Sequence, residues 1–168
     1  MSANRHVLSI STANEPGELA RIAGMFSARG LNIESLSVRP AENPAVSLLV
    51  VVTQGQPKRV DQLVHQLRRL VRVSRVTRLP DNGRVEREVA LIRLRAAGDS
   101  SLGEVSKTMS CLNARVLDSN SEEILIEAAG SANQVAELLS RLQPFGTLQV
   151  VRGGTVAVEW SNPSNCDP

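Results

Sequence analysis

The chain has almost no aromatic side chains: its 168 residues include two Phe, one Trp and no Tyr. The hydrophobic content of 42% still suffices for packing, so the core has to be built from Val, Leu, Ile and Ala. The shortage of aromatic rings also argues against a sheet that binds nucleic acid, because such sheets stack bases on aromatic side chains.

Cysteine is scarce as well, and Cys111 and Cys166 lie too far apart to form a metal-ligand motif. We interpret them as one buried small side chain and one tail thiol, without a disulfide, which favours a reducing compartment. Charges nearly balance, with 19 basic and 17 acidic residues and a net charge of +2. This balance gives no strong overall field for a nucleic acid or an anionic membrane.

No apolar run approaches the roughly 18 residues that a membrane-spanning helix needs. The first six residues lead directly into a strand-like segment, without the apolar stretch of a cleavable signal. We therefore expect a soluble protein of the cytoplasm.

Sequence motifs of catalysis are also missing. The chain has no nucleophile elbow, no zinc-protease motif, no phosphate-binding loop and no dinucleotide-binding glycine motif. The two histidines, His6 and His65, are expected to be structural or solvated, and Gly153-Gly154 is typical of a turn or bulge. The sequence therefore predicts neither catalytic residues nor a metal site.

The sequence does contain a regular alternation of strand-like and helix-like segments. In the first half, two segments repeat apolar residues at i, i+3, i+4 and i+7, the spacing of an amphipathic helix. Strand-like patterns surround them. The predicted strands span residues 6–11, 33–39, 47–53 and 73–79, and the predicted helices carry apolar positions 19–26 and 60–67. This βαββαβ order is that of a ferredoxin-like unit.

The second half repeats the order after a breaker cluster at residues 80–83. Ser131 and Gln134 form a capping-box pattern before the second helix of this half. The expected strands span 89–94, 115–118, 124–128, 148–151 and 155–160, and the expected helices carry apolar positions 102–112 and 135–142. We predict an α+β protein of two consecutive ferredoxin-like units, residues 1–80 and 85–160, with a linker at 81–84 and a tail at 161–168. Small open sheets of this kind favour pairing with a second copy.

One stretch has the features of a ligand site. Asn14 and Gly17 precede a helix start, where unpaired N–H groups can bind a carboxylate, and Asn32 follows that helix. Gly17 lets a ligand approach the backbone, so the three residues could bind the amino and carboxyl groups of a free amino acid. The residues alone leave an ordinary alternative open: Asn14 caps the helix, Gly17 forms a turn, and Asn32 tolerates a left-handed backbone.

A family resemblance adds to this interpretation. The run N-E-P-G-E-L-A-R-I-A-G-M-F-S-A-R-G-L-N-I-E-S-L-S-V resembles the ACT domain, and more specifically the opening of acetolactate synthase small subunits. The run V-E-R-E-V-A-L-I resembles the start of their second domain, and A-R-V-L-D-S-N does so more loosely. The resemblance covers residues 5–160.

The resemblance implies a non-catalytic subunit that forms a homodimer and activates a separate catalytic subunit. That partner would carry thiamine diphosphate, Mg²⁺ and FAD, while this chain would carry no cofactor. It also implies feedback inhibition by a branched-chain amino acid, usually valine, bound where two ACT domains pair. By the same resemblance, the effector site comprises Asn14, Gly17 and Asn32, with backbone donors around Glu18, Leu19 and Ile33.

The family commonly has a basic residue in an S-R-x-T-like run, where this chain has Ser47-Leu48-Leu49-Val50. Two alternatives remain. The first is an ACT-type amino-acid sensor that controls another enzyme or a transcription factor. The second is an RNA-binding protein that uses a basic cluster, although we interpret this cluster as a solvated face or an ion-pairing surface for a protein partner. The cluster comprises Arg68, Arg69, Arg72, Arg75 and Arg78.

Overall fold

The computed structural model describes residues 5–96, 105, 107–109 and 114–160. They form two compact units, the first comprising residues up to 85 together with 155–160, and the second residues 86–154. Residues 105 and 107–109 are helical, whereas the rest of the helix predicted around 102–112 lies outside the described residues, as do Cys111 and Cys166. None of the helices in these described ranges is long and apolar enough to cross a membrane.

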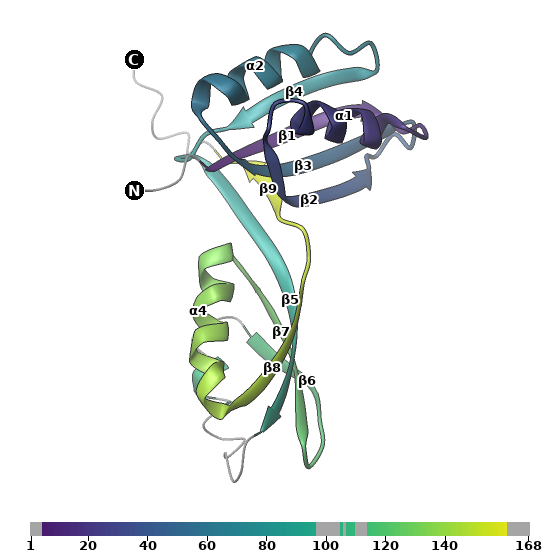
Figure 1. Ribbon diagram of the computed structural model, residues 1–168. Coiled ribbons are helices and arrows are strands. Elements are labelled where there is room, and N and C mark those ends of the chain that lie inside the picture. The colour runs from purple at the N-terminus through teal and green to yellow at the C-terminus, as the bar shows by residue number, and fades with distance from the viewer. Residues whose placement is uncertain (1–4, 97–104, 106, 110–113, 161–168) are drawn as a thin grey trace, which may run out of the picture. The chain divides into compact units, whose positions relative to one another are not determined.

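The first unit is a four-stranded antiparallel sheet with two helices on one face (Figure 1). Its strands follow the order β2-β3-β1-β4, so that β2 and β4 are the edges. The elements are β1 (Arg5–Ala13), α1 (Glu18–Ser27), β2 (Asn32–Pro40), β3 (Val46–Gln54), α2 (Pro57–Leu67) and β4 (Val73–Leu79). The predicted βαββαβ order is confirmed.

Aliphatic side chains fill the space between the sheet and its helices, as the composition predicts. Leu8 and Ile10 of β1 and Leu49 of β3 meet the apolar stripe of the two helices. The fully buried side chains on the helical side are Ile22, Phe26, Val60, Leu63 and Leu67. Phe26 is the one aromatic side chain among them, so the core depends on close packing of many branched residues.

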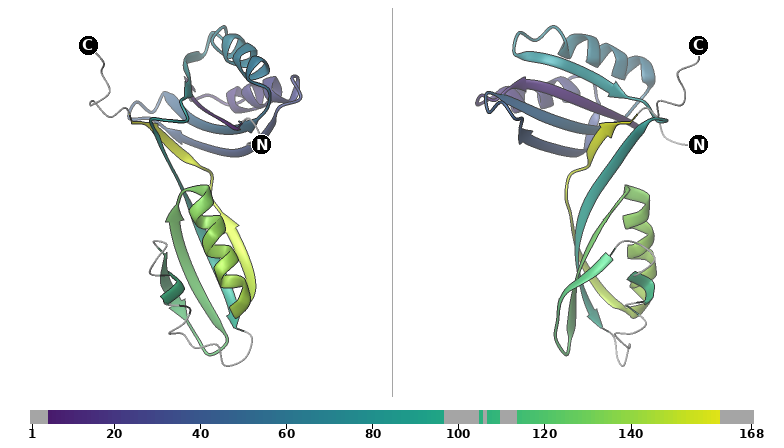
Figure 2. Two further views of the ribbon diagram at one scale, coloured as in Figure 1. Left: turned by 90° about the vertical axis from the view of Figure 1, so that its left-hand side faces the viewer. Right: turned by 180° about the vertical axis from the view of Figure 1, so that it is seen from behind.

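The second unit repeats the plan with the strand order β6-β7-β5-β8, and α4 lies across one face of its sheet (Figure 2). The capping box is confirmed, because the Ser131 hydroxyl accepts the Gln134 N–H and the Gln134 side chain accepts the Ser131 N–H. The elements are β5 (Arg84–Ala96), β6 (Ala114–Ser119), β7 (Glu123–Gly130), α4 (Ala132–Leu142), a short 3-10 helix (Gln143–Phe145) and β8 (Gly146–Arg152).

The last strand, β9 (Val156–Glu159), joins the first unit, whereas the sequence analysis placed residues 155–160 in the second. It pairs with β5, and Ala157 packs against Val7, Val52 and Leu79. These three residues form an apolar patch on the sheet face opposite α1 and α2, because strand side chains alternate between faces and Leu8 and Ile10 pack against the helices. The backbone N–H of Thr155 also donates to Ser35 Oγ at 2.7 Å. The strand therefore covers apolar surface that the helices leave open.

This packing makes a prediction about two adjacent positions on β9. Ala157→Asp would place a carboxylate against Val7 and Val52, and we expect it to lower the free energy of unfolding of the first unit by about 1–3 kcal/mol. Val158 is 59% exposed, so Val158→Asp is the matched control and should change the free energy of unfolding little. Urea unfolding with hydrogen exchange of β1 and β3 amides measures both variants. Equal effects of the two substitutions would contradict the placement of β9.

Candidate functional site

Asn14 follows β1 and fastens the loop before α1 to the turn that leads into β3. Its Nδ2 donates to the Pro44 carbonyl, and its Oδ1 accepts the Ser47 hydroxyl, both at 2.9 Å. Its backbone N–H donates to the Ala45 carbonyl. Asn14 therefore does not cap α1, which corrects the alternative considered from the sequence. Each end of its amide keeps capacity for one more hydrogen bond, because one N–H and one oxygen lone pair remain.

Gly17 is the N-cap of α1, with a left-handed φ of +92° and without a side-chain cap. A Cβ at Gly17 would meet no other atom within 4 Å, so the space beside the backbone is open. The Leu19 and Ala20 N–H groups have no backbone partner within the described ranges, as expected for the first turn of a helix. Two donors at the positive end of the helix dipole thus face open space that a carboxylate can occupy.

Glu18 belongs to an ion cluster beside this loop, and its backbone N–H is not a free hydrogen-bond donor for a ligand. Its backbone N–H donates to Glu15 at a long 3.4 Å, and its side chain is only 7% exposed. The carboxylate lies 3.4 Å from the Arg72 guanidinium, which also contacts Glu15. Glu18 Oε2 has no hydrogen-bond partner among the described residues.

The main chain of Arg72 is tied to the same loop. Its carbonyl accepts the Thr12 hydroxyl at 3.0 Å and the Ala13 N–H at 2.8 Å. Together with the ion pairs to Glu15 and Glu18, these bonds fix the end of β1 and the start of α1 against the segment before β4. Arg72 therefore positions the loop that presents Asn14 and Gly17.

Asn32 and Ile33 lie at the opposite end of the sheet. Ala13, at the end of β1, pairs with Val46, at the start of β3. Asn32, at the start of β2, pairs with Gln54, at the end of β3. Eight residues of extended strand separate these positions, which corresponds to about 26 Å. One chain thus brings together Asn14, Gly17 and Leu19, but not Asn32 and Ile33.

Asn32 nevertheless remains available for binding. It is exposed, and its side chain makes no hydrogen bond to the rest of the described structure, although its carbonyl accepts the Thr53 hydroxyl at 2.6 Å. Ile33 is half-buried and packs against the core. Both residues begin an edge strand, where a second chain can approach.

The sequence analysis missed two residues that shape this site. It noted Ser47 only as the first residue of a run that lacks the basic residue of the family pattern, yet Ser47 is a buried hydroxyl that orients the Asn14 amide. It assigned Arg72 to a general basic cluster, whereas Arg72 holds the loop through Glu15 and Glu18. Ser47 offered a signal, because it is a polar residue at the start of an otherwise apolar strand.

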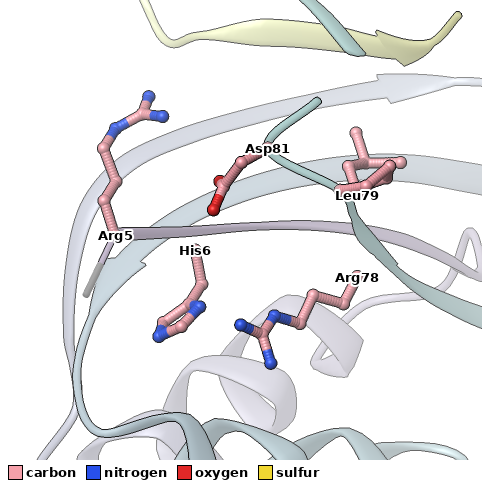
Figure 3. A pocket seen from close by; sticks show the side chains of 6 residues that line it. Arg5, His6, Arg78, Leu79 and Asp81 are labelled. Atoms are coloured by element: carbon pink, nitrogen blue, oxygen red, sulfur yellow. The ribbon is translucent and has the colours of Figure 1, made fainter. Parts of the chain in front are cut away.

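A small pocket at the other end of β1 is lined by Arg5, His6, Arg78, Leu79, Pro80 and Asp81 (Figure 3). Its groups are already engaged: Arg78 pairs with Asp61 at 2.9 Å, and Asp81 pairs with Arg84 at 2.7 Å. His6 Nε2 lies 3.0 Å from the Gly55 carbonyl, which can only accept, so Nε2 carries the proton. The part of the chain that the structure describes holds no group of three or more His, Cys, Asp or Glu side chains suited to a metal ion.

A βαββαβ sheet with an open helix N-terminus and a free edge strand defines an ACT-type α+β protein. Residues 8–75 match the family model for the AHAS small subunit-like ACT domain, and residues 87–161 match that for the small subunit of acetolactate synthase. The chain belongs to the family of acetolactate synthase small subunits.

Individual relatives agree with this assignment. The chain is 33% identical to the probable acetolactate synthase small subunit of Archaeoglobus fulgidus, over 94% of this chain and 98% of that one. It is 36% identical to the small subunit of Mycobacterium leprae, over 91% and 90% of the two chains. The crystal structure of the Thermotoga maritima small subunit matches with a TM-score of 0.84 and 31% identity, covering 95% of this chain and 99% of that one.

The Arg72 cluster yields a stability prediction. Arg72→Met would leave the Glu18 carboxylate buried without its nearest cation, and we expect a loss of about 1–2 kcal/mol, because Arg72 is half-exposed and its ion pairs are partly screened. Arg69→Met is the matched control, because Arg69 is exposed and has no ion pair in the described structure. Urea denaturation measures the free energy of unfolding of both variants. Equal values would show that Arg72 does not hold the loop in position.

Proposed function

We propose that the chain is the regulatory subunit of an acetolactate synthase. In this proposal it binds and activates a separate cytoplasmic catalytic subunit, which carries thiamine diphosphate, Mg²⁺ and FAD, and makes that subunit sensitive to a branched-chain amino acid, in the first place valine. Membership of the small-subunit family supports the partnership. The structural observation that supports an effector site is the open N-terminus of α1 at Gly17.

The two edges of the first sheet differ in a way that supports a dimer through β2. On β4, the Arg68 guanidinium donates to the Val76 carbonyl from Nε at 3.2 Å and from Nη2 at 2.9 Å. This contact satisfies a main-chain acceptor of that edge strand, a common way to prevent strand addition. Within the described ranges no side chain bonds to the main chain of β2 from its outer side, since the Thr53 hydroxyl that donates to the Asn32 carbonyl comes from β3, the inner neighbour.

The surface beside β2 suits close approach of a second copy. Ala20, Gly24 and Ser27 form an exposed stripe of small residues along α1. A Cβ at Gly24 would meet nothing within 4 Å, so this face of the helix is unobstructed. Small residues allow helices to pack closely, and a paired β2 edge would continue the sheet between subunits.

A two-fold pairing of β2 with itself would complete the effector site. Antiparallel strands place the start of one strand beside the end of the other. Asn32 of the partner subunit would therefore lie near Pro40, which pairs with Ser47, the residue that holds Asn14. The roughly 26 Å that separate Asn14 from Asn32 within a chain would thus be bridged by the second chain.

A free amino acid fits the groups that this arrangement would assemble. The Leu19 and Ala20 N–H groups can donate to its carboxylate, and the remaining lone pair of Asn14 Oδ1 can accept from its ammonium group. Asn32 of the partner subunit supplies a further amide. Leu19 is 42% exposed and can contact an aliphatic side chain, which favours valine, leucine or isoleucine over a polar amino acid.

Inhibition then requires only a difference in affinity between two arrangements of the dimer. An effector that spans both chains would bind most tightly to the arrangement that brings Asn14 and the partner's Asn32 together. A coupling free energy of about 1–3 kcal/mol corresponds to a change of about 5- to 150-fold in affinity.

The function is tested by titrating this protein into the catalytic subunit of the same organism and measuring acetolactate formation from pyruvate. We expect activity to rise with the small subunit and to fall again when valine is added. Activation without suppression by any branched-chain amino acid would leave the partnership intact and remove the effector site. An unchanged rate with a competent catalytic subunit would instead favour the amino-acid sensor, and turnover by this chain alone would contradict the regulatory role.

The shared site is tested by mixing two variants. Asn14→Ala and Asn32→Ala homodimers should each lose most valine binding while still activating the catalytic subunit. In a co-expressed heterodimer, one of the two sites regains both asparagines, so we expect about half of the sites to bind valine, as measured by calorimetry. Asn133→Ala, on the exposed face of α4, is the control. A heterodimer that binds no valine would show that both asparagines act within one chain.

A further inference from the structure

The basic residues of this chain are concentrated in one segment. Residues 57–79 contain seven basic residues and one acidic residue, whereas the rest of the chain contains twelve basic and sixteen acidic residues. The net charge of +2 therefore combines a strongly positive segment with a net negative remainder. This segment is α2, β4 and the turn between them, which we call the basic face.

Three cations of the basic face already have partners within the chain. Arg68 binds the Val76 carbonyl, Arg72 pairs with Glu15 and Glu18, and Arg78 pairs with Asp61. The side chains of the other four are exposed and make no hydrogen bond or ion pair within the described ranges: Lys58, Arg59, Arg69 and Arg75. Their charges are available to a partner, and the three paired arginines add to the local positive field.

A groove and an apolar anchor accompany these charges. A hollow of about 340 Å³ follows β4 and is lined by Arg68, Val73, Ser74, Arg75, Val76 and Thr77. Val71, in the turn between Arg69 and Arg72, is 98% exposed. A fully exposed aliphatic residue flanked by arginines is the composition of a protein-binding surface, in which an apolar anchor is surrounded by charges that orient the partner.

We propose that the basic face docks an acidic surface of the acetolactate synthase catalytic subunit, with Val71 entering an apolar pocket of that surface. The inference rests on the proposed function, because the partner is the one that the family implies. The concentration of charge argues for it, because a basic surface favours an acidic partner surface and no other segment of the sequence concentrates positive charge in this way. The location agrees too, because β4 lies at the edge opposite β2 and stays accessible in a dimer formed through β2.

A nucleic acid is the competing partner for a basic surface, and two features disfavour it. No Phe, Tyr or Trp occurs between positions 57 and 79 to stack a base, and Val71, at the centre of the segment, is an aliphatic side chain that is 98% exposed. A protein partner uses both the charges and Val71, whereas a phosphate backbone would use the charges alone.

The test uses the full chain and the catalytic subunit of the same organism. Arg69→Glu/Arg75→Glu should lower the association rate by about tenfold or more at low salt, and the difference should shrink as salt rises. Arg87→Glu/Arg141→Glu changes the total charge equally on the second unit and should have much less effect. Val71→Ser should mainly accelerate dissociation. Valine binding should be unchanged in all three variants, and thermal unfolding should be unchanged in Arg69→Glu/Arg75→Glu and Val71→Ser.

Each result has a defined meaning. If the wild-type chain does not bind the catalytic subunit, the proposed function and the basic face fail together. If it binds and Arg69→Glu/Arg75→Glu behaves like the wild type, or if both double variants lose affinity equally, only the docking surface is overturned. If Arg69→Glu/Arg75→Glu loses binding to a single-stranded RNA oligonucleotide but keeps its affinity for the catalytic subunit, the surface belongs to a nucleic acid and the proposal is wrong.

Discussion

The antiparallel pairing of β3 with β1 on one side and β2 on the other determines which residues of the first unit can contribute to one binding site. Because β1 and β2 both run against β3, the loop after β1 and the start of β2 lie at opposite ends of the sheet. The two asparagines of the candidate site are therefore separated by the length of β3. No rearrangement of side chains can join them, since the ladder hydrogen bonds fix the register. A ligand that needs both residues needs two chains.

The two edges of the same sheet suit two different kinds of contact. Arg68 occupies a main-chain acceptor of β4, and the basic residues around it repel a second β4 edge. Among the residues that the structure describes, none gives the β2 edge a comparable side-chain bond, and this edge lies beside the small residues of α1. Because the β4 side is blocked for strand pairing but rich in charge, it suits a side-chain-mediated contact, while β2 suits a main-chain-mediated one.

The sequence predicted the elements of the fold better than their mutual contacts. Period-3.6 and period-2 patterns located α1, α2 and the four strands of the first unit, because those periods follow directly from which side chains face the core. The capping box at Ser131 was predictable since both partners lie within four residues. Contacts between distant segments leave no such local pattern. Asn14 resembles a helix cap in sequence, yet it binds Pro44 and Ser47, thirty and thirty-three residues away.

The placement of β9 shows the same limit, and its contacts can be compared with the coupling free energy that the proposed regulation would need. Its alternating residues predict a strand but not which sheet it covers, and the choice depends on the apolar patch of Val7, Val52 and Leu79. The bond from the Thr155 N–H to Ser35 Oγ ties the start of this segment to β2. One such hydrogen bond contributes about 0.5–1.5 kcal/mol, which is comparable to the coupling of about 1–3 kcal/mol that effective feedback inhibition needs. If an effector binds at the β2 edge as proposed, a few contacts within the first unit would suffice to make its conformation depend on that effector.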